Sequence, residues 1–287
     1  MNKKLLIFGC GYTAQAIGKN LSDNNWQVFG TTRLQENFNG LIGLGIIPVM
    51  WEDQSRIESI IKNGCSILIS VAPKESMDIV LQRFLDVIMT YKSDINWLGY
   101  LSSTGVYGNK LGEWVFEDSV LNPTTDRGKV RVKVEKIWQK LAISIEVPLY
   151  IFRISGIYGP GRSAIDRIRN GKVQKIFKKD HYFNRIHLDD IVGIVISALF
   201  SPNLAGIYNL SDDLPSPGGD VIDEAARLLN LPILNEVNFQ DADLTEMGQS
   251  FFLESKKVSN KKLKCALGYS FKHPTYLSGL LSILKNY

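Results

Sequence analysis

Cysteine and histidine are scarce in this chain of 287 residues, which has three of each. The cysteines are widely spaced and odd in number, so they form neither a Cys-x-x-Cys pair nor a disulfide framework: Cys10, Cys65 and Cys265. A site built from histidine and cysteine ligands would have to combine distant segments, because the histidines are His181, His187 and His273. We therefore expect no metal.

Long apolar runs and charge of one sign are also missing. No apolar run approaches the roughly 18 residues of a membrane span. The first run, from Leu5 to Phe8, is shorter than the apolar core of a signal peptide. Lysine and arginine total 33 against 29 aspartate and glutamate, and a net charge of +4 is too mild to indicate a nucleic-acid-binding face. We expect a reduced cytoplasmic protein that binds neither nucleic acid nor membrane.

Short apolar runs alternate with amphipathic helical stretches through the first half of the chain. The length and the 45% hydrophobic content fit one large or two modest domains. Strand–helix alternation at this spacing predicts an α/β fold whose parallel sheet is covered on both faces. We expect strands at 4–8, 27–31, 46–50, 66–71, 97–102, 149–154 and 207–210, and helices at 13–22, 77–91, 128–142 and 190–200.

The alternating pattern weakens after about residue 156. Glycine and proline gather in the stretches 156–171 and 212–220, with a helix and a strand between them. We therefore assign residues 1–156 and 184–210 to a first domain. Residues 157–183 and 211–287 form a smaller lobe, and a ligand is expected between the two, at the carboxyl ends of the strands.

A glycine-rich loop, Gly9-Cys10-Gly11-Tyr12-Thr13-Ala14, follows the first strand and begins the first helix. It fits G-x-G-x-x-G/A, whose glycines allow a tight turn and a close backbone approach to a pyrophosphate at the helix N-terminus. This context predicts a dinucleotide-binding domain. The alternative is a glycine turn in a sheet protein without a ligand, and Cys10 is interpreted as a small loop residue.

The end of the second strand bears on which dinucleotide is bound. NAD sites usually carry a carboxylate here that holds the ribose 2′-hydroxyl, but this strand ends Gly30-Thr31-Thr32-Arg33. A guanidinium beside two hydroxyls suits a 2′-phosphate, because arginine pairs with phosphate in a bidentate manner. The sequence favours NADP, with NAD as the alternative. Arg33 as a solvated loop charge is the plainer interpretation.

Five later segments make the chain similar to a known family. In them it resembles the extended short-chain dehydrogenases/reductases, the group of nucleotide-sugar epimerases and dehydratases: Leu101–Gly108, Arg153–Gly161, Arg185–Ile191, Gly206–Leu210 and Lys257–Leu263. The resemblance covers nearly the whole chain. It implies a Rossmann-like, doubly wound parallel sheet of about seven strands that binds NAD(P), and a small C-terminal substrate lobe.

The chain departs from this family at the residues that move protons. The resemblance implies a serine, at Ser103, and a Tyr-x-x-x-Lys pair on the following helix, but arginines stand at both aligned positions, Arg127 and Arg131. Arginine stays protonated and cannot act as an acid/base near neutral pH. The two arginines share a helix face with Glu135 and could hold a phosphate or an anionic substrate. A solvated surface with an Arg131–Glu135 pair is the alternative.

Other groups could move the proton if catalysis survives. The candidates are two tyrosines expected near the nicotinamide, a lysine one position off the helix face and a histidine: Tyr107, Tyr158, Lys129 and His187. Each also has a structural interpretation. The tyrosines would be packing and cofactor-pocket residues, and His187 with Asp189 and Asp190 would form a hydrogen-bonded helix start joining the lobes.

Together these features predict the site and its function. The catalytic candidates are Ser103, Arg127, Arg131 and Tyr107, and the cofactor-binding candidates are Gly9, Gly11, Tyr12, Thr13, Ala14, Thr32, Arg33, Ala72, Ser102 and Tyr158. We expect an NADP-dependent oxidoreductase or epimerase that acts on a small polar molecule, for which a nucleotide sugar is one candidate. The alternative is a catalytically silent dinucleotide-binding sensor or scaffold. Dimers are common in the family, but no residue here requires one.

Overall fold

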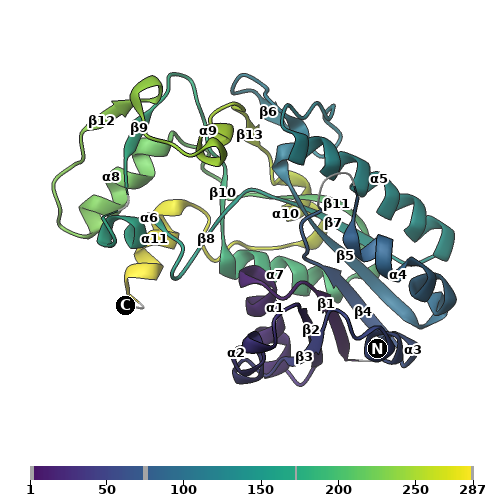
Figure 1. Ribbon diagram of the computed structural model, residues 1–287. Helices are drawn as coiled ribbons and strands as arrows, with labels where there is room; N and C mark the ends of the chain where they lie inside the picture. Colours follow the sequence, from purple (N-terminus) through teal and green to yellow (C-terminus); the bar gives the residue numbers. More distant parts are fainter. Residues whose placement is uncertain (1–2, 74–76, 172, 286–287) are drawn as a thin grey trace. The chain divides into compact units, whose positions relative to one another are not determined.

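The computed structural model describes residues 3–73, 77–171 and 173–285 (Figure 1). The chain divides into two compact units. The first unit comprises Met1–Ser102, Val130–Phe152 and Val192–Tyr208, and the second comprises Ser103–Lys129, Arg153–Ile191 and Asn209–Tyr287. The ranges of the units, like the domain ranges expected from the sequence, also contain residues 1–2, 74–76, 172 and 286–287, which lie outside the described part.

The two units differ from the expected domains mainly in two segments. Residues 103–129 and 184–191 group with the second unit, although we had expected both in the first domain. A physical reason for the first segment is a short parallel pairing between β6 (Trp114–Val115) and β13 (Lys257–Val258), which ties it to the C-terminal part of the chain. The roles assigned to the two domains stay predictions.

A seven-stranded sheet forms the centre of the fold, with the strand order β11-β7-β5-β4-β1-β2-β3. The pairings β3–β2, β2–β1, β1–β4 and β4–β5 are parallel. The order reverses direction at β1, which is typical of a doubly wound sheet, so the predicted fold class is confirmed. The strands are β1 (Lys4–Phe8), β2 (Gln27–Thr32), β3 (Ile47–Met50), β4 (Cys65–Ile69), β5 (Ile95–Ser103), β7 (Leu149–Ile154) and β11 (Gly206–Leu210).

One face of this sheet is buried under three helices, α3 (Gln54–Lys62), α4 (Ile79–Thr90) and α5 (Asp126–Ile145). Their apolar faces join the strands in one continuous core, with Phe8 packed on Phe84 at 5.1 Å between ring centroids. Helices α1 (Tyr12–Asp23), α2 (Phe38–Gly43) and α7 (Leu188–Leu199) lie across the sheet from α4 and α5 (Figure 1). The central strands are short but apolar on both faces, which follows from this double cover.

The second unit is built from short elements around a small core. Helices α6 (Ala164–Arg169), α8 (Gly218–Leu228) and α11 (Tyr276–Lys285) supply the buried residues Ile165, Ala225 and Leu280. None of the helices in the described ranges combines the length and the hydropathy needed to cross a bilayer. The remaining elements are β8 (Gly156–Tyr158), β9 (Lys175–Phe177), β10 (Arg185–His187), β12 (Glu236–Asn238), α9 (Glu246–Phe251), α10 (Lys261–Leu267) and the 3-10 turns at Gln35–Asn37, Lys92–Asp94, Thr104–Tyr107, Pro202–Leu204 and Phe239–Asp241.

Candidate functional site

The glycine loop connects β1 to α1, as the sequence predicts. Gly9 has a φ of +84°, a conformation that residues with a Cβ rarely adopt. A Cβ built at Gly9 would also lie 2.5 Å from Cγ2 of Val71, in the loop after β4. Glycine at position 9 is therefore required by the fold itself.

Gly11 shows the opposite environment. A Cβ built on it meets no atom of the described chain within 4 Å, so the protein's own packing does not demand glycine there. Gly11 is the N-cap of α1, which begins with no side-chain cap and no acidic residue in its first turn. The open space and the positive end of the helix dipole are what a bound pyrophosphate would use. Tyr12, Thr13 and Ala14 form the first turn of this helix, in which Thr13 and Ala14 are buried.

Two side chains that were not among the predicted site residues, Thr31 and Gln15, hold the loop in place. The Gly9 amide donates to Oγ1 of Thr31 at 2.9 Å, and Gln15 Nε2 donates to the Cys10 carbonyl at 3.0 Å. The sequence analysis had placed the hydroxyls of both Thr31 and Thr32 beside Arg33 for a 2′-phosphate, but Thr31 is buried and supports the loop instead. Burial raises the pKa of Cys10 to about 12, which keeps the thiol protonated and fits a small loop residue.

The end of β2 presents Arg33 to solvent. The guanidinium makes no hydrogen bond or ion pair with any described residue. Thr32 closes the turn, where its hydroxyl oxygen accepts hydrogen bonds from the Leu34 amide at 3.2 Å and from Asn37 Nδ2 at 3.1 Å. Ala72 is exposed and follows Val71, the residue that packs at Gly9. Arg33 and Ala72 are therefore accessible, as cofactor-binding residues would need to be.

Ser102, at the carboxyl end of β5, is buried and bonded to helix α5. Its hydroxyl donates to Oε1 of Glu135 at 2.5 Å, and both side chains are less than 5% exposed. Arg131, one turn earlier, is half-buried and donates to the Leu101 carbonyl at 2.9 Å. The sequence analysis had placed Glu135 on one helix face with the arginines, with a solvated surface as the alternative. That alternative is wrong for Glu135, because its side chain is buried.

The other catalytic candidates belong to the second unit. Ser103 caps the following turn by accepting a hydrogen bond from the Gly105 amide at 3.1 Å. Arg127 donates to Oγ of Ser250 at 2.9 Å and lies over the ring of Phe251. Arg127 thus anchors helix α9 in this structure.

Tyr107 is fully buried, and its hydroxyl is committed to two partners. It donates to Oδ1 of Asn209 at 2.6 Å and accepts from Nη1 of Arg153 at 3.0 Å. Burial raises the pKa of Tyr107 to about 12, although the Arg153 charge acts in the opposite direction. These features weigh against the predicted acid/base role, which stays a prediction.

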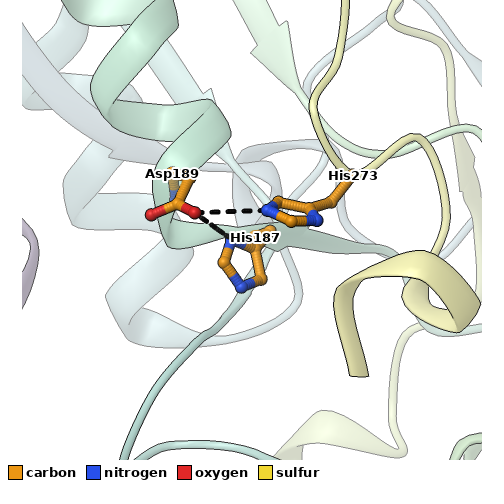
Figure 2. Close-up of side chains that lie close together, drawn as sticks. All are labelled: His187, Asp189 and His273. Carbon is orange, nitrogen blue, oxygen red and sulfur yellow. Dashed lines mark hydrogen bonds and ion pairs between the residues drawn. The ribbon is translucent and has the colours of Figure 1, made fainter. Parts of the chain in front are cut away.

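Two histidines and an aspartate meet in the second unit, as Figure 2 shows. Asp189 Oδ2 lies 3.2 Å from Nε2 of His273 and 3.6 Å from Nδ1 of His187. Burial lowers the pKa of His187 to about 4, helped by His273, while Asp189 acts in the opposite direction. The neutral ring packs edge-on against Tyr158, at 5.1 Å between centroids. The predicted cluster at the start of α7 exists, but it also includes His273, which the sequence analysis had not placed there.

A cavity of about 590 Å³ lies within the second unit. Tyr158 lines it, and its hydroxyl donates to the Thr275 carbonyl at 3.4 Å. Burial lowers the pKa of Arg185 to about 10, with Asp212 opposing, so this guanidinium stays charged at neutral pH. The cavity lining also contains two other arginines, two asparagines and several apolar side chains, including Arg162, Arg167, Asn170, Asn184, Ile176, Phe183, Val221 and Phe252. The lining also includes the Asp166 carboxylate, whose Oδ2 accepts hydrogen bonds from the Ser163 amide and hydroxyl. With three arginines against this one carboxylate, the lining suits a molecule with both negative charge and apolar surface.

Known proteins similar to this chain include a conserved protein of unknown function from Silicibacter pomeroyi. Its solved structure is 37% identical, with a TM-score of 0.92 and coverage of 99% of this chain and 98% of that one. Protein YeeZ of Escherichia coli K12 is 25% identical over 285 residues, 95% of this chain and 97% of YeeZ. No family model matches the chain.

A solved enzyme with known chemistry shares the fold. The structure of dTDP-glucose 4,6-dehydratase from Bacillus anthracis, in complex with NAD, has a TM-score of 0.77 at 17% identity, with coverage of 99% of this chain and 96% of that enzyme. This likeness confirms the resemblance to the extended short-chain dehydrogenases/reductases at the level of fold. The chain belongs to the same family as the Silicibacter pomeroyi protein, and its fold is that of the epimerase/dehydratase group of extended short-chain dehydrogenases/reductases.

Proposed function

We propose that this protein binds a nicotinamide dinucleotide at the Gly9–Ala14 loop, prefers NADP, and acts as an oxidoreductase or epimerase on a small anionic molecule. The observation that carries the proposal is Gly11, where an added Cβ would meet no protein atom and would enter the space in front of α1. A glycine kept where the fold does not need it supports close approach by a ligand. The NAD complex of the structurally similar dehydratase supports the same assignment.

The residues present fit such a group. The loop and the start of α1 would hold the pyrophosphate, and Thr32 and Arg33 would flank a 2′-phosphate. When bound, the nicotinamide supplies hydride transfer. The chain's own contribution in this region is positioning, since Arg131 is held by the Leu101 carbonyl and cannot exchange protons at neutral pH.

The substrate we propose is a small molecule that carries negative charge. Support comes from the cavity of the second unit, where Arg162, Arg167 and Arg185 accompany an apolar wall. A nucleotide sugar has this combination of a charged phosphate and an apolar ring face. The proposal includes no nucleic-acid or membrane partner. It is compatible with a homodimer.

A catalytically silent dinucleotide-binding protein is the second candidate. It is favoured by one observation, the engagement of Arg127 with Ser250 and Phe251 at the position where the family places its tyrosine. An enzyme should oxidise bound NADPH with some member of a panel of carbonyl compounds and nucleotide sugars, or interconvert a nucleotide sugar. A silent protein should bind NADPH equally well and show no turnover with the panel.

Calorimetric titration of the Gly11→Leu variant with NADPH tests the binding step. We expect the affinity to fall at least about 100-fold, because the side chain would occupy the space of the pyrophosphate. The melting temperature should stay close to that of the wild type, because the new side chain points into open space.

Gly40→Leu is the matched control, since a Cβ at Gly40 in α2 also meets no atom within 4 Å. This variant should bind NADPH like the wild type. Unchanged affinity in Gly11→Leu would remove the loop as the dinucleotide site.

A further inference from the structure

Three side chains from two segments of the second unit bring their donor atoms together: Nδ1 of His187 and Oδ2 of Asp189 at the start of α7, and Nε2 of His273 from a segment 84 positions after Asp189 (Figure 2). All three atoms lie within 4.8 Å of one another. We propose that they bind a divalent transition-metal ion of the zinc or cobalt type. This inference is independent of the proposed dinucleotide function, because none of the three residues belongs to the glycine loop.

The spacing of the donor atoms matches a metal ion. Zinc bonds of about 2.0–2.1 Å to imidazole nitrogen and 2.0–2.2 Å to carboxylate oxygen, in tetrahedral directions, separate two ligand atoms by about 3.4 Å. The carboxylate oxygen lies 3.2 Å from one imidazole nitrogen and 3.6 Å from the other. The two imidazole rings pack against each other with centroids 3.9 Å apart, so binding an ion would require them to turn until their nitrogen lone pairs point to a common centre.

The kind of ligand indicates the kind of ion. Two imidazoles with one carboxylate suit zinc, cobalt, nickel or iron(II), whereas calcium and magnesium prefer sites made of oxygen. His187 is 2% exposed and His273 is 8% exposed, but the Asp189 side chain is about half exposed at 50%. The ion would reach the site from the side of Asp189, where water could fill the remaining coordination position.

His187 already has the tautomer that coordination requires. Its Nδ1 accepts a hydrogen bond from the Asp189 amide at 3.1 Å, so the proton of the neutral ring is on Nε2. Coordination through Nδ1 needs the same lone pair and no transfer of the ring proton. The ion would take the place of this backbone hydrogen bond, and the negative charge of Asp189 would help to compensate for its loss.

The neighbouring Asp190 positions the third ligand. Its buried carboxylate accepts hydrogen bonds from the His273 amide at 3.0 Å, from the Lys272 amide at 2.7 Å and from the Tyr269 hydroxyl at 3.1 Å. The backbone that carries His273 is therefore fixed against the start of α7 without any ion. A bound ion would add a second clamp between the 269–273 segment and this helix start.

Titration of the purified full chain with Co²⁺, followed by visible absorption and calorimetry, tests the proposal. We expect one ion per chain with d–d absorption bands, and an increase in melting temperature when Zn²⁺ is added. The half-exposed ligand offers a conservative variant, Asp189→Asn, which should weaken Co²⁺ binding by at least about 10- to 100-fold, the loss typical even of outer-shell partners. His273→Gln should have the same effect.

The remaining histidine gives the matched control. His181→Gln, made in a Cys265→Ser background that removes the exposed thiol, should keep the full affinity and spectrum. Circular dichroism verifies the fold of each variant. The proposal is overturned if the wild-type chain binds no stoichiometric Co²⁺, or if Asp189→Asn and His273→Gln bind it as tightly as the wild type. In that case the three residues form only a hydrogen-bonded helix start.

Discussion

At the scale of single residues, the glycine loop separates what the fold needs from what a ligand needs. The fold requires glycine at position 9, because of the positive φ and the close approach of Val71. At position 11 no described atom lies close enough to exclude a larger side chain. The motif alone could not make this distinction, because both residues are glycines in a fixed pattern. Arg33 is a similar case, since its exposure leaves the guanidinium accessible to a ligand.

Reversing the charge at Arg33 tests the NADP preference. Arg33→Asp should lower the affinity for NADPH at least about 10-fold, because a charge-assisted pair with the 2′-phosphate would become a repulsion. The affinity for NADH should change by less than about threefold, and competitive calorimetry with both cofactors measures the difference.

Lys62→Asp is the matched charge reversal, on the exposed end of α3. It should change the two affinities equally and only slightly. Equal losses of NADPH and NADH binding in Arg33→Asp would show that Arg33 does not read the 2′-phosphate.

At the scale of elements, the sequence predicted the sheet better than the second unit. The expected strands and helices of the first half all occur, with ends that shift by at most three residues. The apolar residues of these strands and helices form runs or repeats that are long enough to be recognised in the sequence. In contrast, β6 and β13 have two residues each and pair across more than a hundred positions, so no local pattern could reveal them.

The site was predicted unevenly for the same reason. The glycine loop is local, and its context could be seen in the sequence. The Ser102–Glu135 bond and the approach of His273 to Asp189 join residues 33 and 84 positions apart. Glu135 was expected on a polar helix face because a charged side chain usually faces solvent. Its buried partner, Ser102, is distant in the sequence.

Asp78 links two helices of the first unit and gives an element-scale prediction. Its carboxylate caps α4 by accepting from the Val80 and Leu81 amides, and its second oxygen accepts from Nε1 of Trp138 in α5 at 3.1 Å. Asp78→Ala should lower the free energy of unfolding by about 2–4 kcal/mol, through the lost cap and the buried indole N–H left without this partner. Urea denaturation measures the change.

The control is another helix cap without an interhelical bond. Asp53 caps α3 on the surface and accepts from the Arg56 amide at 3.0 Å. Asp53→Ala should lower the free energy of unfolding by only about 1 kcal/mol. Equal losses in the two variants would mean that the Trp138 bond contributes nothing.

At the scale of the whole molecule, the chain passes between its two compact units at 102/103, 129/130, 152/153, 191/192 and 208/209. The expected division had fewer crossings, because sequence patterns locate elements but not their partners. Each unit is therefore assembled from segments that lie far apart in the sequence.

Asp212 predicts how the stability of the fold depends on pH. Burial raises the pKa of this carboxyl to about 7, with Arg185 and the Leu214 amide acting in the opposite direction, against about 3.9 in an unfolded chain. The folded state therefore binds the proton more tightly. The contribution of Asp212 to stability is full below about pH 4 and is lost as the pH rises to about 7.

Urea denaturation across this pH range compares the wild type with Asp212→Asn, which imitates the protonated form. The variant should gain stability relative to the wild type as the pH increases from about 4 to 7, and the difference should then level off. Asp118→Asn, at an exposed carboxylate, should show no such trend. A pH-independent difference for Asp212→Asn would contradict the prediction.

The buried bond between Ser102 and Glu135 has a consequence for how sequences of this kind can vary in length. One residue inserted within α5 ahead of Glu135 would rotate that side chain by about 100° about the helix axis, away from β5. The bond therefore fixes which side chains of α5 face the sheet. Insertions and deletions should be tolerated in the solvent-accessible stretch Asp118–Leu121 between β6 and α5, because a change of length there leaves β6, the buried turn at Thr104–Tyr107 and the sheet-facing side chains of α5 in place.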